Sequence, residues 1–176
     1  MKHLVLLSGG LDSAALLYEL ASKQDKADIT AVFFNYGQKS YEREKAAVET
    51  IALKLGIKLM QIDISEVFKY SNSSLVKHND SPITNAVITD NKTEHTSQNT
   101  EIEFRNGVML AAGISLALQL HPNEAVTVYY GAAKTREPYP DCSLVFTEYM
   151  NLLASYVSGG RVKVKAPLLN LGKDEI

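Results

Sequence analysis

A six-residue stretch near the amino terminus, SGGLDS at positions 8–13, combines residue types that suit phosphate binding. It lies between two apolar runs, so it is expected to form the turn from a buried strand into a helix. Glycines permit a tight turn, and the backbone amides at the start of a helix attract anions. Asp12 adds a carboxylate that would repel a polyphosphate unless a cation lay between them, which makes Asp12 a candidate Mg²⁺ ligand. The alternative is that Asp12 or Ser13 is simply the N-cap of the helix.

Two widespread phosphate loops do not match this stretch. A Walker A loop requires Gly-Lys-Ser or Gly-Lys-Thr, and the dinucleotide-binding fingerprint requires a third glycine, neither of which follows here. The stretch therefore predicts a nucleotide site of another kind.

Further candidate binding residues stand at predicted strand ends and helix starts. Tyr36 and Gln38 follow an apolar strand at its carboxyl end, where open α/β sheets bind ligands, although packing alone would also account for Tyr36. Arg105 precedes an apolar helix, and its guanidinium can bind a carboxylate or phosphate, or form an ordinary surface ion pair. Cys142 is the single cysteine, and a small buried side chain is its simplest interpretation. The four histidines show no metal-ligand spacing.

The hydrophobic pattern predicts the elements that position these residues. Short apolar runs alternate with longer amphipathic segments, which indicates βαβ units, a parallel sheet of about five strands and helices on both faces. The predicted strands are residues 4–7, 29–34, 58–64, 126–130 and 162–164. The predicted helices are residues 13–22, 40–55, 108–120 and 143–157. The third of these helices is almost wholly apolar and is expected to be buried.

The regular pattern lapses between about residues 65 and 100, where Ser, Asn, Thr and Asp predominate. A connection of this length is typical of a lid, a binding loop or an insertion. The chain has 176 residues, 45% of them hydrophobic, and a net charge of −2, so a single domain over residues 1–176 is expected. The weak charge gives no reason to expect a nucleic acid or a membrane as partner. No apolar run approaches ~20 residues, and we predict a cytoplasmic protein.

The SGGLDS turn resembles the SGGxDS signature of the PP-loop ATP pyrophosphatases, whose fold is a Rossmann-like three-layer α/β sandwich of the adenine nucleotide alpha hydrolase type. Within that superfamily, three further stretches resemble the 7-cyano-7-deazaguanine synthases: NYGQKSYEREKAAVETIALKLG at 35–56, EFRNGVMLAAGISLA at 103–117 and PYPDCSLVF at 138–146. KAPLLNLGK, near the carboxyl terminus, matches as well. The resemblance runs from Lys2 to Ile176, and the combination of stretches makes it specific.

This resemblance implies an ATP-dependent C–N ligase. Members activate the carboxylate of 7-carboxy-7-deazaguanine with ATP and take ammonia to form the amide. They then dehydrate the amide with a second ATP to the nitrile preQ0, in queuosine biosynthesis. The resemblance also implies Mg²⁺ at Asp12, a homodimer, and catalytic roles for Asp12, Ser13, Arg105 and Lys173.

Two sets of binding residues follow from the same resemblance. The implied ATP-binding residues are Leu7, Ser8, Gly9, Gly10, Leu11, Asp12, Ser13, Ala14, Ala15, Leu16, Leu17, Asn35 and Tyr36. The implied substrate residues are Gln38, Arg105, Asn106, Tyr139, Pro140, Asp141 and Cys142. Tyr139 can stack on the flat deazapurine, and Asp141 can accept hydrogen bonds from its N–H groups. A proline turn with Asp141 as a helix N-cap is the alternative.

The chain also departs from the family's pattern. The family's four-cysteine zinc site has no cysteines to form it here, and we expect a chain that is shortened relative to the family. The usual Val-Pro-Gly before Arg-Asn is replaced by Ile102, Glu103 and Phe104. Two alternatives therefore stay open. One is a ligase that acts on another carboxylate or a tRNA base, or stops at the amide; the other is a non-catalytic nucleotide-binding subunit.

Overall fold

The protein is built on one five-stranded parallel sheet. The computed structural model describes residues 1–80, 100–133, 139–172 and 175–176. In chain order the strands are β1 (Lys2–Leu6), β2 (Ile29–Asn35), β3 (Lys58–Asp63), β4 (Val126–Tyr129) and β5 (Val162–Lys165). Their order in the sheet is β3-β2-β1-β4-β5 and all neighbours are parallel. The order reverses direction at β1, so the gap between β1 and β4 is the switch point at which such sheets bind ligands.

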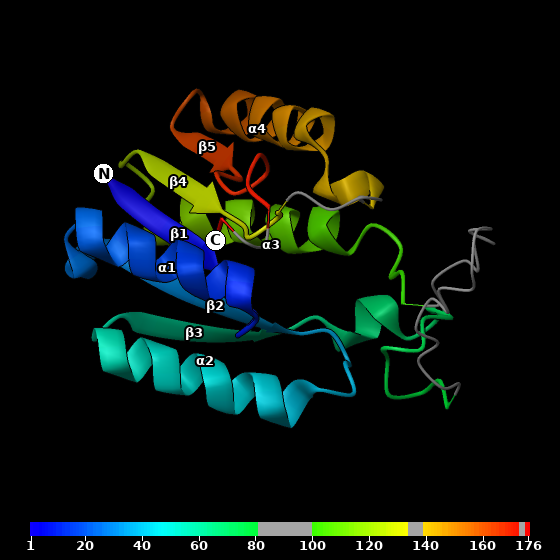
Figure 1. Cartoon of the computed structure of the whole chain (residues 1–176). Coiled ribbons are helices and arrows are strands. Elements are labelled where there is room, and N and C mark those ends of the chain that lie inside the picture. Colours follow the sequence, from blue (N-terminus) through cyan, green and yellow to red (C-terminus); the bar gives the residue numbers. More distant parts are fainter. Residues whose placement is uncertain (81–99, 134–138, 173–174) are drawn as a thin grey trace.

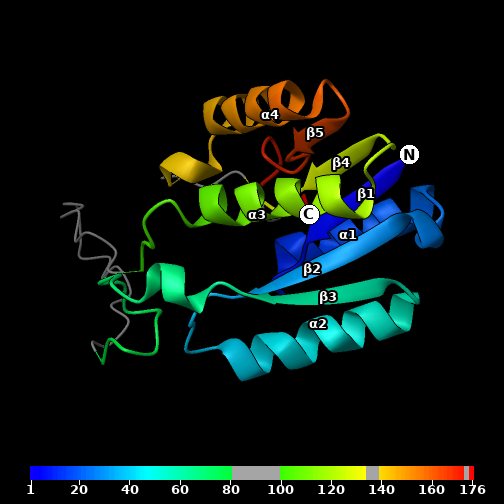
Figure 2. The same ribbon diagram turned by 180° about the vertical axis from the view of Figure 1, so that it is seen from behind.

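Four α-helices cover the two faces of the sheet. They are α1 (Leu11–Lys23), α2 (Tyr41–Leu55), α3 (Arg105–Leu120) and α4 (Leu144–Ser158). Helices α1 and α2 lie on one face, and α3 and α4 lie on the other, as the two opposite views show (Figures 1 and 2). The alternation of side chains along β1 produces this arrangement: Leu4 and Leu6 pack with α3 and α4, whereas Val5 and Leu7 pack with α1 and α2. The expected three-layer α/β fold is confirmed.

Local sequence signals explain the start of α4 and the ends of α2 and α4. The Ser143 hydroxyl accepts a hydrogen bond from the backbone N–H of Phe146 at 3.1 Å and so caps α4. Gly56 and Gly159 follow α2 and α4 in the left-handed conformation that stops helices, with φ of 69° and 62°. Three short 3-10 helices, Lys26–Asp28, Ser65–Phe68 and Pro140–Cys142, connect the elements.

The burial expected for the 108–120 helix is only half right. Leu110, Ile114 and Ala117 of α3 are buried against the sheet, but Ala111 and Ser115 are exposed. The helix covers the face of the sheet as an outer layer, so solvent reaches its far side and only one stripe joins the core.

Part of the expected 65–100 insertion is ordered against the sheet. Residues 65–80 follow β3, and Val76 packs with Tyr36, Phe68 and Ile102 in a small apolar cluster. Gln38 and Val76 form an isolated antiparallel bridge that holds this segment to the end of β2. Residues 81–99 lie outside the described part of the chain. In the ranges that are described, no helix has both the length and the apolar character needed to cross a bilayer.

Candidate nucleotide-binding site

A cavity of about 750 Å³ opens at the carboxyl ends of β1, β2 and β4. This volume lies within the usual range for small-molecule sites, and the place is the switch point of the sheet. The lining residues come from four segments far apart in the sequence: Leu6, Leu7, Ser8, Gly10, Leu11, Asp12, Ser13, Val32, Phe33, Phe34, Tyr36, Glu44, Arg105, Asn106, Met109, Tyr130, Gly131, Ala132, Ala133, Tyr139 and Cys142.

The SGGLDS turn forms one wall of the cavity and is held from behind by α2. Gly9 has φ +78°, in the left-handed region that favours glycine. A Cβ atom on Gly9 would lie 3.1 Å from the Ala47 side chain and 3.2 Å from the Glu44 carbonyl oxygen. Glycine at this position therefore allows both the turn and its close contact with α2.

Two hydroxyls fix the shape of the turn from inside. The Ser13 hydroxyl accepts a hydrogen bond from the Ser8 backbone N–H at 3.2 Å and donates to the Gly10 carbonyl at 3.1 Å. The N-cap of α1 is Gly10, with no side-chain cap. The alternative that Asp12 or Ser13 is the N-cap is therefore wrong. The helix begins at Leu11, so both residues already lie within its first turn.

The start of α1 presents unpaired polar groups to the cavity. The backbone N–H groups of Leu11, Asp12 and Ser13 are the first of the helix and have no partner four residues back. The Asp12 carboxylate lies beside them, half-buried, and it makes no hydrogen bond or ion pair with any residue of the described ranges. An anionic group at the amides with a cation held by Asp12 fits this arrangement.

Gly131, just after β4, sets how closely the opposite wall approaches α1. A Cβ atom there would lie 2.8 Å from the Ser13 nitrogen and 2.9 Å from its Cα, which is closer than real side chains come. The absence of a side chain at Gly131 thus lets the backbone after β4 touch the first turn of α1.

Arg105, the first residue of α3, faces the same cavity from the other side. Its guanidinium carbon lies 5.4 Å from the centre of the Tyr36 ring, and Nη1 donates to the Tyr36 hydroxyl at 3.4 Å. Burial raises the pKa of the Tyr36 phenol, so the ring stays neutral beneath the cation. No carboxylate in the described part of the chain pairs with Arg105, so the surface ion pair considered above is not seen there.

The backbone before Arg105 is unusual. Phe104 has φ 55° and is the one non-glycine residue with positive φ among those described. Its ring covers Gly107, where a Cβ atom would come within 2.2 Å of the ring, and it meets the Phe146 ring edge-on at 6.0 Å. Phenylalanine therefore occupies a left-handed position that suits glycine, and ring packing holds it there.

Asp141 stabilises the start of α3. Its Oδ2 accepts a hydrogen bond from the Asn106 backbone N–H at 2.9 Å, while the Asn106 side chain donates to the Asp141 carbonyl at 3.3 Å. Asp141 does not cap α4, which follows it, because Ser143 does so. The expectation that Asp141 is the N-cap of the helix that follows it is therefore wrong. Its carboxylate instead accepts a hydrogen bond at the start of α3, whose N-cap position is Phe104.

Cys142 is a protonated thiol near neutral pH. Burial, with the neighbouring Asp141 charge, raises the pKa of the Cys142 thiol to about 11. Its Sγ accepts a hydrogen bond from the Asn106 side-chain amide at 3.2 Å. The small side chain that was expected to be buried is half-buried, and this environment does not favour a thiolate nucleophile.

Several residues predicted for the site lie behind its surface or outside the described chain. Gln38 is buried, and its amide is used internally: Oε1 accepts from Tyr36 N at 2.9 Å, and Nε2 donates to the Phe34 carbonyl and to Glu44. The Asn35 amide donates to Asp63 at 2.7 Å. The other residues predicted for the site that do not line the cavity are Gly9, Ala14, Ala15, Leu16, Leu17, Pro140 and Asp141. Lys173 lies outside the described residues.

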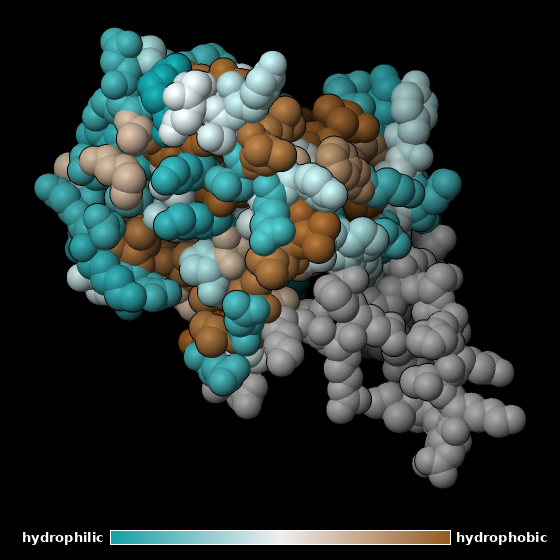
Figure 3. All heavy atoms as spheres, turned by 90° about the horizontal axis from the view of Figure 1, so that it is seen from above, coloured by the Kyte–Doolittle hydropathy of each residue, from teal (hydrophilic) through white to brown (hydrophobic). Residues whose placement is uncertain are grey.

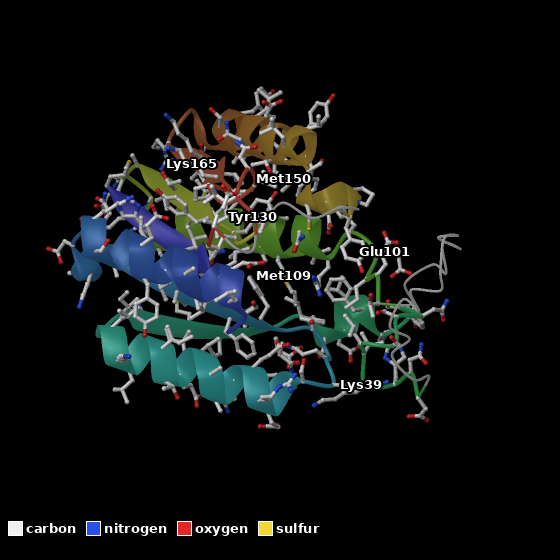
Figure 4. All side chains as sticks on the ribbon, viewed as in Figure 1. Lys39, Glu101, Met109, Tyr130, Met150 and Lys165 are labelled. Atoms are coloured by element: carbon white, nitrogen blue, oxygen red, sulfur yellow. The ribbon has the colours of Figure 1, made fainter. Side chains whose placement is uncertain are left out.

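Sequence reasoning missed lining residues in five places: Leu6 of β1, residues 32–34 of β2, Glu44 of α2, Met109 of α3, and residues 130–133 after β4. Glu44 comes from the first turn of α2, and Met109 comes from α3. Met109 and Tyr130, which both line the cavity, are labelled in Figure 4. Tyr130 follows β4 with Gly131, and its hydroxyl contacts Thr147 Oγ1 at 2.6 Å. Burial raises the pKa of Tyr130 to about 12. The available signal was the carboxyl end of the fourth predicted strand, which in a parallel sheet meets the same edge as the SGGLDS turn.

Because the Asp141 carboxylate stabilises the start of α3, we expect different effects from its substitution by asparagine and by alanine. Asp141→Asn keeps an oxygen that accepts a hydrogen bond from the Asn106 N–H. Its kcat/KM should therefore stay within a few-fold of the original value, and its unfolding free energy within about 1 kcal/mol. Asp141→Ala should cost about 1–2 kcal/mol of unfolding free energy and lower kcat/KM, because Arg105 loses its anchored helix start. Denaturant unfolding and steady-state kinetics measure both.

Ser143→Ala is the matched control for this pair. It removes the cap of α4, so stability should fall by a similar amount with little change in KM. If Asp141→Asn instead loses ~100-fold or more in activity, the carboxylate binds substrate N–H groups directly. The amide NH2 of asparagine would then face one of those N–H groups as a second donor and could not accept its hydrogen bond.

The fold and the turn together define a class. A doubly wound parallel sheet whose first strand-to-helix turn is SGGLDS is that of a PP-loop type α/β nucleotide-binding protein. The family described as "Queuosine biosynthesis protein QueC" matches residues 2–176, and the chain belongs to this family.

Individual relatives agree with this assignment. A 7-cyano-7-deazaguanine synthase of a Nitratiruptor species is 32% identical over 182 residues, which cover 100% of this chain and 76% of that protein. The synthase of the same name from Methanocaldococcus jannaschii is 32% identical, over 100% of this chain and 75% of its own length. The one from a Marinomonas species is 34% identical over 99% and 75%. The chain thus spans about three quarters of each relative.

Proposed function

We propose that the protein is an ATP-dependent C–N ligase that converts 7-carboxy-7-deazaguanine and ammonia to 7-cyano-7-deazaguanine. The observation that carries the proposal is the pairing of groups across one cavity. Among the described residues, the free amides and unpaired carboxylate of α1 stand on one side, and the guanidinium of Arg105, which has no carboxylate partner there, stands on the other. Similarity to synthases of that name supports the choice of substrate.

In this proposal the amides of α1 and the SGGLDS turn bind the β- and γ-phosphates of ATP. The turn is already shaped by Ser8 and Ser13, so its donors need no reorganisation when an anion arrives. The α-phosphorus then faces the cavity, with the two outer phosphates held as the leaving group. Mg²⁺ bound at Asp12 would neutralise the phosphate charge that the Asp12 carboxylate otherwise opposes.

Arg105 binds the carboxylate of the second substrate. Its guanidinium has no competing carboxylate in the described ranges, and the Tyr36 ring beneath it fixes its plane. The carboxylate oxygen attacks the α-phosphorus, pyrophosphate leaves, and an acyl adenylate forms. Ammonia then displaces AMP and gives the amide. A second ATP activates the amide oxygen and AMP leaves with it, so that loss of the amide protons yields the nitrile.

Other residues support the flat heterocycle of the substrate. Tyr139 and Met109 line the cavity near Arg105 and offer an aromatic and a polarisable surface on which the ring can pack. Asn106 and Asp141 hold the start of α3, so they act on the substrate through Arg105. The ligands that we propose are therefore small molecules, and not a nucleic acid or a membrane. We propose that the protein is a homodimer in the cytoplasm.

A single assay tests this function against its alternatives. The protein is incubated with ATP, Mg²⁺, ammonium and 7-carboxy-7-deazaguanine, and the products are followed by mass spectrometry. We expect the nitrile, with AMP and pyrophosphate. Accumulated amide would indicate an enzyme that stops one step earlier. ATP binding without any substrate-dependent AMP would contradict the proposal and indicate a non-catalytic subunit.

A further inference from the structure

Glu44, in the first turn of α2, places a second carboxylate in the cavity, besides that of Asp12. Charged side chains are usually exposed, and on the face seen in Figure 3 hydrophilic residues lie at the outer surface, where water surrounds them. Glu44 is instead half-buried, and no lysine or arginine of the described ranges forms an ion pair with it. The amine of Lys45, the next residue, lies 6.0 Å from the centre of the Tyr41 ring. The Glu44 carboxylate therefore has no cationic partner among the described residues.

Two uncharged donors hold the Glu44 carboxylate in place without neutralising it. The Ser40 hydroxyl donates to Oε1 at 2.5 Å, and Gln38 Nε2 donates to Oε2 at 3.0 Å. A carboxylate has about four acceptor positions, so each oxygen keeps one that is not used by these bonds. A fixed anion with free acceptor positions is suited to a small cation that carries N–H donors.

A series of hydrogen bonds connects Glu44 to Arg105. The buried Gln38, which donates to Glu44, accepts from the Tyr36 backbone N–H at 2.9 Å, and the Tyr36 hydroxyl accepts from Arg105 at 3.4 Å. Both charges reach the Tyr36 phenol: burial raises its pKa, the charge of Arg105 opposes this rise, and the charge of Glu44 adds to it. Gln38 and Tyr36 therefore hold the anionic group and the cationic group of the cavity at a fixed separation.

The balance of charge in the cavity indicates what Glu44 binds. The charged side chains among the described lining residues are Asp12, Glu44 and Arg105, so two carboxylates accompany one guanidinium. This inference rests on the proposed function, in which ATP and the deazaguanine carboxylate are anions and Mg²⁺ is placed at Asp12. Ammonium is then the remaining cation among the reactants. We propose that Glu44 binds the ammonium ion and is a catalytic residue in the formation of the amide.

The Glu44 carboxylate also serves as the base for the bound ion. One N–H bond of ammonium breaks, the proton passes to a Glu44 oxygen, and neutral ammonia remains. The nitrogen lone pair attacks the carbonyl carbon of the acyl adenylate. The bond between that carbon and the phosphate oxygen breaks, and AMP leaves with the electron pair of this bond. A second proton passes from the new amide nitrogen to water, and Glu44 returns its own proton to water before the next turnover.

Glu44→Gln, with Glu42→Gln as its control, tests the proposal in the full chain. Glutamine can keep both internal bonds, because its amide oxygen can accept from Gln38 and its NH2 can donate to the Ser40 hydroxyl. Ammonium chloride is varied at constant ionic strength with ATP, Mg²⁺ and 7-carboxy-7-deazaguanine. We expect kcat/KM for ammonium to fall roughly 30-fold or more in Glu44→Gln. Glu42 is an exposed acid of the same helical turn and does not line the cavity, so Glu42→Gln should leave this value unchanged.

Two measurements that do not use ammonium separate this role from a role in ATP binding. The exchange of pyrophosphate into ATP that depends on 7-carboxy-7-deazaguanine reports formation of the acyl adenylate, and it should be unchanged in Glu44→Gln. Hydroxylamine, which is uncharged near neutral pH, should convert the adenylate to the hydroxamate equally well in both proteins. Loss of either activity in Glu44→Gln would overturn the proposal, because the carboxylate would then act on ATP or its metal. An unchanged kcat/KM for ammonium would overturn it as well.

Ser40→Ala is a second variant that keeps the test decisive if Glu44→Gln does not fold. The Ser40 side chain makes no capping hydrogen bond to α2, so its removal affects mainly the donor to Glu44 Oε1. As a positioning residue, Ser40 should raise the KM for ammonium several-fold when it is replaced, with pyrophosphate exchange unchanged. If Glu44→Gln does not fold, an unchanged KM in Ser40→Ala would overturn the proposal. A native chain without substrate-dependent exchange would instead contradict the proposed function, and the role of Glu44 would be rejected with it.

Discussion

Asp12→Ala is expected to lower kcat/KM for nitrile formation by more than tenfold and to abolish the magnesium dependence of ATP binding. The Asp12 carboxylate lies at the first turn of α1 and has no partner in the described ranges, so its removal should cost the fold little. If the Asp12 carboxylate holds a cation against the phosphates, its removal also removes the cation, and the negative charge of the phosphates is then not neutralised. Calorimetry of ATP with and without Mg²⁺ measures the binding, and steady-state kinetics measures the turnover.

Glu19→Ala is the control for this prediction. Glu19 is an exposed acid on the same helix, and its side chain pairs with Lys23 at 2.5 Å, away from the cavity. It changes the net charge equally but should leave ATP binding and turnover unchanged. An Asp12→Ala protein that binds ATP with the same affinity and the same magnesium dependence would remove the metal role from Asp12.

Gly131→Ala is expected to damage the site through its backbone alone. The added Cβ atom would lie 2.8 Å from the Ser13 nitrogen, so the first turn of α1 and the segment after β4 must move apart. Overpacking of this kind costs about 1–3 kcal/mol of unfolding free energy. Because the displaced nitrogen belongs to the amide group that faces the cavity, ATP affinity should fall tenfold or more.

Gly10→Ala provides the matched comparison for stability. The nearest atom to a Cβ on Gly10 is the Ser8 hydroxyl oxygen at 3.5 Å, an ordinary contact, and Gly10 has φ −74°. Alanine is less favourable than glycine at an N-cap, but it also lowers the entropy of the unfolded chain, and these two effects are of similar size. The unfolding midpoint of Gly10→Ala in denaturant should therefore stay close to that of the original chain, whereas that of Gly131→Ala should be lower. Equal midpoints for all three proteins would show that the contact between Gly131 and Ser13 relaxes without cost.

The regular elements and the family could be predicted from the sequence. Alternating apolar runs set five strands and four helices to within a few residues, because each depends on the side chains of its own segment. Helices α2 and α4 end at Leu55 and Ser158, within one residue of their predicted ends, and a glycine follows each of them. The resemblance carried by SGGLDS and PYPDC is confirmed by the family match over residues 2–176.

The roles of individual polar residues could not be predicted in the same way. Gln38 stands at a strand end, which favours a ligand role, yet the structure encloses it among Tyr36, Phe34 and Glu44. Asp141 precedes α4, which favours an N-cap role there, yet its carboxylate accepts a hydrogen bond from the Asn106 backbone N–H at the start of α3. In both cases the deciding partner is brought close by the sheet and not by the local sequence.

The sequence by itself determined the order of the elements, the phosphate-binding character of the turn at residues 8–13, and the family. These depend on neighbouring residues, whose spacing along the chain fixes periodicity, turn geometry and the charge at a helix start. Only the tertiary structure decided that Arg105 lies over Tyr36, that Gly131 touches Ser13, and that one side of α4 stays uncovered by the described residues. The contacts of Arg105 and Gly131 join segments that are separated by many residues in the sequence. The exposure of the α4 side chains depends on which other elements pack against that helix. All three follow from how the parallel sheet brings its strand ends and its outer helices together.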